Sequence, residues 1–424
     1  MNDWSDPLLS SPGYKGYPAS APALRRSQLA TRGWNLLAGD LPLPLAVVRR
    51  DALAHNLGWL QGLADRARIG LAPHGKTTMS PELFRAQLDA GAWGITFANV
   101  QQLAVGVAAG VRRALIANQV LQAAELHALA ALLAAHPGLR APFLVDSAAQ
   151  LACIERAGTG VAFEVLVELG LPGGRTGVRD DDAALTLARR LHASPAVCLV
   201  GVEAYEGLWA TGDDAGDRAL VDGLVGRLQR LATACEAEGL FETPQPLVSA
   251  GGSAVFDLVA DGLARLTGGR AWRGLLRSGC YVTHDDGAYR RYAQAVNRRL
   301  GCADASGLTA ALEVWAVVQS CPEPGLAILG AGKRDASADW GLPVALKFAH
   351  AGERTLHPAP ASWVVDKMND QHAYLTLGDA GVPLQVGDRV ALGISHPCTT
   401  FDKWRWMPIV DEAYTVVDAL TTHF

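Results

Sequence analysis

The chain has 424 residues, half of them hydrophobic and only 19% charged, which suits one large globular domain with a second, smaller one. A net charge of -5 with only short basic clusters argues against nucleic acid as a partner, because phosphate neutralisation needs clustered Lys and Arg side chains. The N-terminal stretch is polar and rich in Pro and Gly, and the chain has no run of about 18 uncharged apolar residues, so we expect a cytoplasmic protein without membrane contact.

Between about residues 45 and 285, apolar strand-like runs alternate with Ala- and Leu-rich helical runs. This alternation is typical of βα units around a parallel sheet. Eight runs predict strands, at residues 68–73, 94–99, 114–118, 142–147, 163–170, 198–205, 246–252 and 274–279. We predict a (β/α)8 barrel, although the strand count alone leaves a doubly wound sheet open.

After about residue 290 the pattern changes to alternating runs such as LEVWAVVQS and HAYLTL, separated by the turn signals PEPG and VGD. Such runs are typical of antiparallel strands. We therefore expect three parts. An N-terminal segment (1–44) joins the β domain, the barrel occupies 45–289, and a C-terminal β domain occupies 290–424.

Lys76 follows the first predicted barrel strand, in the stretch GLAPHGKTTMSPE. Barrel enzymes place their chemistry at the C-terminal ends of the strands. A lysine partly withdrawn from water loses some preference for its charged form and can then react with a carbonyl group or remove a proton. The alternative, which the local sequence alone favours, is a solvated lysine ahead of a helix that is capped by Ser80 and has Pro81 at its first position.

Two small-residue turns follow the last two predicted strands, in VSAGGSAVFD and LRSGCYVTHDD. Backbone N–H groups in such turns can bind a phosphate, and barrel phosphate sites favour these two loops. Ordinary βα turns are the alternative. A lysine and a phosphate cradle on the same barrel face indicate pyridoxal 5'-phosphate (PLP).

Six motifs occur in the order PHGKTTM, GGRTGV, EAYEG, SAGGS, RSGCYV and SHPCTTFDKW. This series resembles the D-serine dehydratase and D-threonine aldolase group of fold-type III, alanine-racemase-like PLP enzymes, over nearly the whole chain. The resemblance implies a barrel that binds PLP, a C-terminal β domain, and a homodimer in which the second subunit helps to close the site.

The resemblance also implies roles for single residues. Lys76 would bind PLP covalently and act as the catalytic base, Arg175 would approach the phenolic oxygen of the cofactor, and Tyr205 would lie close to it. Taken singly, Arg175 could be a loop charge and Tyr205 a core aromatic. The residues that match the phosphate-side turns are Gly251, Gly252, Gly279 and Tyr281.

His396 and Cys398 lie two residues apart, and in an extended segment such residues point to the same face. Alone, the pair is weak support for a metal, since an isolated His and a core Cys explain it better. The resemblance implies a divalent metal held by a His-x-Cys or His-x-Asp pair. Thiolate favours Zn²⁺, with Mn²⁺ as the alternative. Two protein ligands leave coordination positions open for substrate.

Within the resembling group, the Cys form of the pair is typical of dehydratases and the Asp form of aldolases. We therefore predict a PLP- and zinc-dependent dehydratase that converts a small D-3-hydroxyamino acid, such as D-serine or D-threo-3-hydroxyaspartate, to a keto acid and ammonia. One alternative is D-threonine aldolase-type cleavage to glycine and an aldehyde. Another is a non-catalytic PLP carrier.

Overall fold

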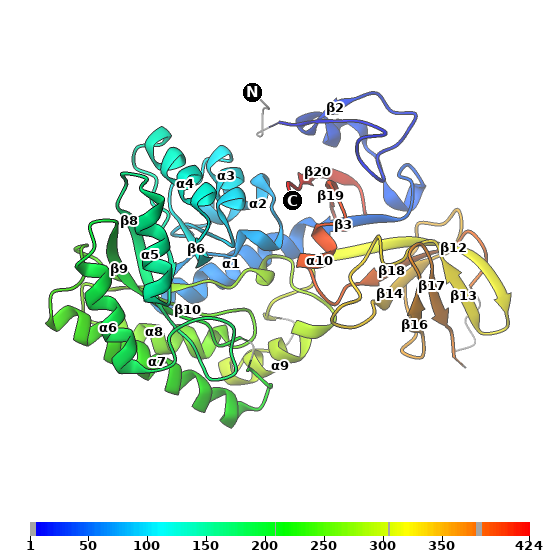
Figure 1. The fold of residues 1–424 in the computed structure, drawn as a ribbon. Coiled ribbons are helices and arrows are strands. Elements are labelled where there is room, and N and C mark those ends of the chain that lie inside the picture. Colours follow the sequence, from blue (N-terminus) through cyan, green and yellow to red (C-terminus); the bar gives the residue numbers. More distant parts are fainter. Residues whose placement is uncertain (1–5, 208, 304–305, 379–383) are drawn as a thin grey trace.

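The computed structural model describes residues 6–207, 209–303, 306–378 and 384–424. Figure 1 shows a barrel surrounded by helices on one side of the molecule and antiparallel strands on the other, with helix α9 (Ala288–Leu300) between them. Among the described residues, no helix has both the length and the apolar character needed to cross a bilayer.

The barrel consists of parallel strands in the order β4-β11-β10-β9-β8-β7-β6-β5 among the described residues. Their bounds are β4 (Gly70–Leu71), β5 (Ile95–Phe97), β6 (Ala114–Gln119), β7 (Phe143–Val145), β8 (Phe163–Leu169), β9 (Val197–Ala204), β10 (Leu247–Ala250) and β11 (Arg273–Leu276). Just beyond β4, His74 forms a parallel bridge with Thr96 of β5, whose N–H donates to the Pro73 carbonyl at 2.8 Å. The sheet therefore closes on itself, which confirms the predicted barrel and excludes an open sheet.

Helices connect successive barrel strands, a further helix precedes the first barrel strand, and together they cover the outside of the sheet. Their bounds are α1 (Arg50–Arg66), α2 (Pro81–Asp89), α3 (Val100–Ala108), α4 (Ala123–Ala135), α5 (Ala148–Ala157), α6 (Asp181–His192), α7 (Asp214–Ala237) and α8 (Phe256–Thr267). Side-chain oxygens of Asn99, Ser147, Asp180 and Asp213 accept the backbone N–H three residues later and so cap α3, α5, α6 and α7. These caps fix where the chain leaves each strand-end loop.

One residue from each of six neighbouring barrel strands contributes to an apolar cluster that is separate from the main core. The cluster consists of Leu115, Leu144, Leu166, Val200, Leu247 and Leu275. A barrel of eight strands has an interior just wide enough to be filled by side chains. This packed interior confines an open site to the loops at the strand ends.

The antiparallel part is organised around the long strand β12 (Leu312–Glu323), which pairs with strands on both of its sides. The other strands are β13 (Leu326–Leu329), β14 (Val344–Ala349), β15 (His357–Pro358), β16 (Val364–Met368), β17 (Ala373–Thr376), β18 (Arg389–Gly393), β19 (Trp406–Val410) and β20 (Val416–Thr421). Strand order within this sheet is β15-β14-β18-β12-β13-β17-β16 for the described part of the chain, and β19 pairs with β20.

Residues 45–49 were expected in the barrel, but β3 (Leu45–Arg49) pairs antiparallel with β12 and parallel with β19. Figure 1 shows β3 beside β19 and β20, so residues from both ends of the chain meet in one sheet. Strands β1 (Leu8–Leu9) and β2 (Leu24–Arg25) pair with each other. The remaining domain boundaries stay a prediction.

Gly201 of β9 provides a test of the barrel packing. A Cβ atom at this position would lie 2.1 Å from the Leu247 carbonyl oxygen of β10, so Gly201→Ala must push two backbones apart. We expect a loss of about 1–3 kcal/mol in unfolding free energy, which would lower the thermal midpoint. The control is Gly223→Ala on the exposed side of α7, where a Cβ meets nothing within 4 Å and should stabilise the helix by about 0.5–1 kcal/mol. Equal midpoints for the two variants would contradict this packing.

Candidate active site

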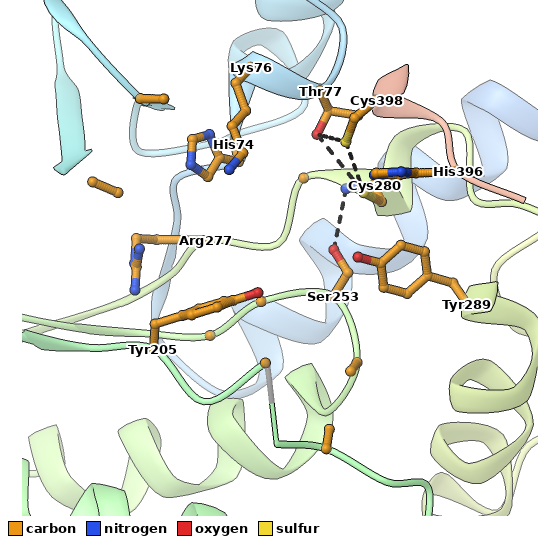
Figure 2. Close-up of a pocket in the computed structure, with 18 of the residues that line it drawn as sticks. His74, Lys76, Thr77, Tyr205, Ser253, Arg277, Cys280, Tyr289, His396 and Cys398 are labelled. Atoms are coloured by element: carbon orange, nitrogen blue, oxygen red, sulfur yellow. Dashed lines mark hydrogen bonds between the residues drawn. The ribbon is translucent and has the colours of Figure 1, made fainter. Parts of the chain in front are cut away.

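A cavity of about 760 Å³ lies at the C-terminal ends of the barrel strands, facing the β domain. Its lining comes from the barrel loops, from α9 and from the β domain. Representative residues are His74, Lys76, Glu168, Arg175, Glu203, Tyr205, Gly252, Arg277, Cys280, Tyr289, Trp340, His396 and Cys398. Figure 2 shows many of these side chains converging on one space.

Lys76 lies in the short helical turn η3 (Gly75–Thr77) directly after β4 and is half-buried. In Figure 2 its side chain points into the space between Arg277 and Cys280. Burial lowers the pKa of its amine below 10.5; Cys398 opposes this change, and the charges of Arg175 and Arg277 lower the pKa further. The environment therefore increases the neutral, reactive fraction of the amine at a given pH.

The helix after Lys76 starts at Pro81 as predicted, but Ser80 does not cap it through its side chain. The Ser80 hydroxyl instead donates to Glu82 Oε2 at 2.8 Å. Glu82 also accepts hydrogen bonds from the backbone N–H and the hydroxyl of Thr421, at 3.1 and 2.9 Å. This turn is thus bonded to the end of the described chain.

The two glycine turns lie face to face beside Lys76. Ser278 donates its hydroxyl to the Gly252 carbonyl at 2.6 Å, which links the turns. A Cβ atom on Gly252 would lie 2.7 Å from the Tyr205 ring, and one on Gly279 would lie 2.8 Å from His74. Only glycine allows the backbone to approach so closely, and small-residue turns of this kind suit a phosphate. The Gly252 N–H itself donates to Glu206 Oε1 at 2.9 Å.

Gly251, Gly252 and Gly279 all line the cavity, whereas Tyr281 does not. The Tyr281 side chain is buried in the core, and its hydroxyl accepts a hydrogen bond from Gln87 Nε2 at 3.4 Å. Tyr281 therefore supports the wall behind the turn. Its neighbour in the sequence, Cys280, is the residue that reaches the cavity.

Arg175 and Tyr205 meet at the cavity wall, where the guanidinium lies 4.9 Å from the centre of the Tyr205 ring. Such a contact between a cation and a ring is attractive. Arg175 is therefore not a loop charge far from the cavity, and Tyr205 is not an aromatic of the core. Both side chains face the space next to the glycine turns.

Three buried charges at the strand ends were not found by sequence reasoning. Arg277 Nη2 donates to Glu203 Oε2 at 2.6 Å, and both side chains are almost inaccessible to solvent. Burial raises the pKa of Glu203 to about 8, with Arg277 opposing that change. Glu168 accepts a hydrogen bond from Thr176 at 2.7 Å. In the sequence, each of these residues is recognisable as a charged residue within an otherwise apolar predicted strand.

His396 and Cys398 both line the cavity, but not from an extended segment. Pro397 has helical backbone angles, and Cys398 is the first residue of α10 (Cys398–Phe401). His396 Nδ1 lies 2.6 Å from Asp339 Oδ2, and its ring stacks on Trp340 at a centroid distance of 4.3 Å. A carboxylate on Nδ1 fixes the ring orientation and leaves Nε2 as the nitrogen that could bind a metal.

Cys398 lies against the turn that carries Lys76. Its sulfur is 3.4 Å from Thr77 Oγ1 and 3.6 Å from the sulfur of Cys280. The hydrogen bond with Cys280 lowers the pKa of Cys398 well below 9, burial opposes this effect, and His396 lowers the pKa further. A thiolate is the form that binds a metal. Among the described residues, no three or more His, Cys, Asp or Glu side chains gather as a metal site, so metal binding by His396 and Cys398 stays a prediction.

Comparison with known proteins agrees with this geometry. Residues 48–265 match the family described as alanine racemase, N-terminal domain, and residues 311–410 match the putative serine dehydratase domain. The first match covers more than half of the chain. The chain belongs to the D-serine dehydratase and D-threonine aldolase family of fold-type III, alanine-racemase-like, PLP-dependent enzymes.

Curated members of this family catalyse two different reactions. D-threo-3-hydroxyaspartate dehydratase from Delftia sp. (strain HT23) is 29% identical over 379 residues, which cover 85% of this chain and 92% of the relative. D-threonine aldolase from Arthrobacter sp. is 28% identical over 352 residues, which cover 82% of this chain and 83% of the relative. The two identities are too similar to choose between the reactions.

Solved structures share the fold over almost the full length. D-threonine aldolase from Filomicrobium marinum superposes with a TM-score of 0.76 at 26% identity, covering 92% of this chain and 97% of the other. D-threo-3-hydroxyaspartate dehydratase from Delftia sp. HT23 gives a TM-score of 0.73 at 25% identity, with coverages of 92% and 99%. The barrel and the β domain thus occur together in both members.

The environment of Lys76 predicts an unusual pH dependence. In the protein without cofactor, a trace of an amine-reactive reagent should label Lys76 at half of the maximal rate at a pH below 10.5. Labelling is followed by peptide mass spectrometry. Arg175→Leu removes a nearby positive charge and should move this midpoint upward, whereas Arg190→Leu on the outer helix α6 should not. A wild-type midpoint at or above 10.5 would contradict the burial of the amine.

Proposed function

We propose that the chain is a PLP- and zinc-dependent lyase that dehydrates a D-3-hydroxyamino acid, such as D-serine or D-threo-3-hydroxyaspartate, to a keto acid and ammonia. The observation that carries this proposal is that Lys76 and the His396–Cys398 pair line one cavity. Thr77, next to Lys76, is within hydrogen-bond distance of the Cys398 sulfur. A proton-accepting amine and a pair of metal ligands are therefore neighbours.

The cavity residues fit PLP. Lys76 would hold the cofactor covalently, the turns at Gly252 and Gly279 would bind its phosphate, and Arg175 and Tyr205 would contact its ring. The close packing of the glycine turns supports this assignment, because a side chain at Gly252 would collide with Tyr205 and one at Gly279 with His74. When bound, PLP withdraws electrons from Cα of the amino acid and so acidifies the Cα proton.

Lys76 is the residue placed to accept that proton. Its lowered pKa leaves more of the amine in the neutral form at a given pH, which a general base requires. Because the amine enters the cavity from one wall only, it reaches one face of a bound amino acid. This one-sided approach supports a preference for one enantiomer, and the D-amino acid substrates for which the relatives are named support the D form.

The donor set of His396 and Cys398 fits a divalent metal. Asp339 and Trp340 hold the imidazole, and the Cys398 thiolate favours zinc, with manganese as the alternative. A zinc ion held by two protein ligands has open positions, where it would act as a Lewis acid on the β-hydroxyl group. Departure of that oxygen as hydroxide is the step that separates dehydration from cleavage.

Retro-aldol cleavage to glycine and an aldehyde is the alternative, supported by the aldolase relatives at 26–28% identity. It needs the β-oxygen to remain on Cβ and lose its proton to a base. The Cys form of the metal pair supports dehydration instead. We also propose a homodimer, supported by the family resemblance, and a cytoplasmic location, supported by seven free cysteines.

Product analysis tests the reaction type. Purified protein supplied with PLP and zinc should convert D-serine to pyruvate and ammonia faster than D-threonine to glycine and acetaldehyde, and L-serine should react poorly. Lys76→Ala should abolish turnover, because it removes the base, whereas Lys333→Ala at an exposed site should leave it unchanged. Glycine and aldehyde as the dominant products, with no keto acid, would favour the aldolase.

Asp339 provides a test of the metal site that does not depend on turnover. Asp339→Asn should weaken zinc binding about 10–100-fold, because the imidazole of His396 loses its orienting carboxylate. Asp402→Asn changes a nearby exposed carboxylate and serves as the matched control. Zinc affinity is measured by competition with a chromophoric chelator. Equal zinc affinities of wild type and Asp339→Asn would contradict zinc binding by His396.

A further inference from the structure

Cys280 and Cys398 face each other at the edge of the cavity, with their sulfur atoms 3.6 Å apart. Cys280 begins η4 (Cys280–Val282), just after the last barrel strand, whereas Cys398 begins α10 in the β domain. The two residues are 118 positions apart in the chain. Figure 2 shows both side chains next to Thr77, with a dashed line joining the two sulfurs.

The contact is short enough for a disulfide to form with little movement. A disulfide bond is about 2.05 Å long, so the sulfurs need to approach by about 1.5 Å, which small side-chain rotations can supply. Both residues are free cysteines in the structure. Both residues line the cavity, and Cys398 is partly exposed whereas Cys280 is buried, so a small oxidant that enters the cavity meets Cys398 more readily.

We propose that Cys280 and Cys398 form a reversible disulfide when a hydroperoxide enters the cavity. The Cys398 sulfur attacks the peroxide, the O–O bond breaks, and an alcohol or water leaves with the proton as Cys398 becomes a sulfenic acid. The Cys280 sulfur then attacks that sulfur, the S–O bond breaks and water leaves. Two electrons pass from the cysteine pair to the peroxide, and a dithiol returns them.

This crosslink has two consequences at the site. It removes the Cys398 sulfur as a metal ligand, and it ties the loop after β11 covalently to α10 across the cavity edge. Loss of turnover on oxidation rests on the proposed function. Formation of the disulfide does not, because it needs only the two sulfurs and the oxidant.

The test treats the full-length protein with hydrogen peroxide and follows crosslinked peptides by mass spectrometry under non-reducing conditions. Wild type should lose two hydrogen atoms, with the peptides of Cys280 and Cys398 joined, and dithiothreitol should reverse the change. Cys280→Ser should give no crosslink. Cys321→Ser, which changes an exposed cysteine, should crosslink like wild type.

Two results would overturn the pairing: a crosslink between other cysteines, or oxidation of Cys398 to sulfinic acid in wild type without any crosslink. Zinc content and turnover of the oxidised protein are measured in parallel. A Cys280–Cys398 crosslink that leaves both unchanged would support the pairing and contradict the proposed metal role of Cys398. The two proposals can therefore fail separately.

Discussion

Hydrogen bonds between the turn after β4 and the last residues of the chain determine the geometry of the whole site. Glu82 accepts two bonds from Thr421, and the His423 N–H donates to the Met79 carbonyl at 3.0 Å. The Glu82–Thr421 bonds join residues 339 positions apart, and the Glu82 side chain is buried. They hold the β domain, which carries His396 and Cys398, against the turn that carries Lys76.

Backbone strain in the same turn shows how tightly the segment is held. Met79 is fully buried and has φ of 43°, a left-handed conformation that costs a non-glycine residue about 1–2 kcal/mol. The Met79 N–H donates to the Gly75 carbonyl at 2.9 Å, and its own carbonyl is held by His423. Bonds on both sides offset the strain. The left-handed conformation of Met79 turns the chain from the strand end toward α2, while Lys76 stays directed into the cavity.

Withdrawal from water gives the site its reactivity. An apolar cluster fills the barrel interior, so the charges at the strand ends have little solvent to stabilise them. Burial is the first cause of the lowered pKa of Lys76 and of the raised pKa of Glu203. A direct 2.6 Å contact between Arg277 and Glu203 replaces part of the hydration that both side chains lose on burial.

Hydrophobic periodicity and turn chemistry are local properties, so the amino-acid sequence alone predicts the barrel strands, the place of Lys76 after the first of them, and the glycine turns. Only the tertiary structure placed β3 in the antiparallel sheet, directed Tyr281 into the core, and brought Asp339 to His396 and Cys280 to Cys398. These contacts depend on how the β domain packs on the barrel. No local pattern records that packing, because it is decided by side chains far apart in the chain.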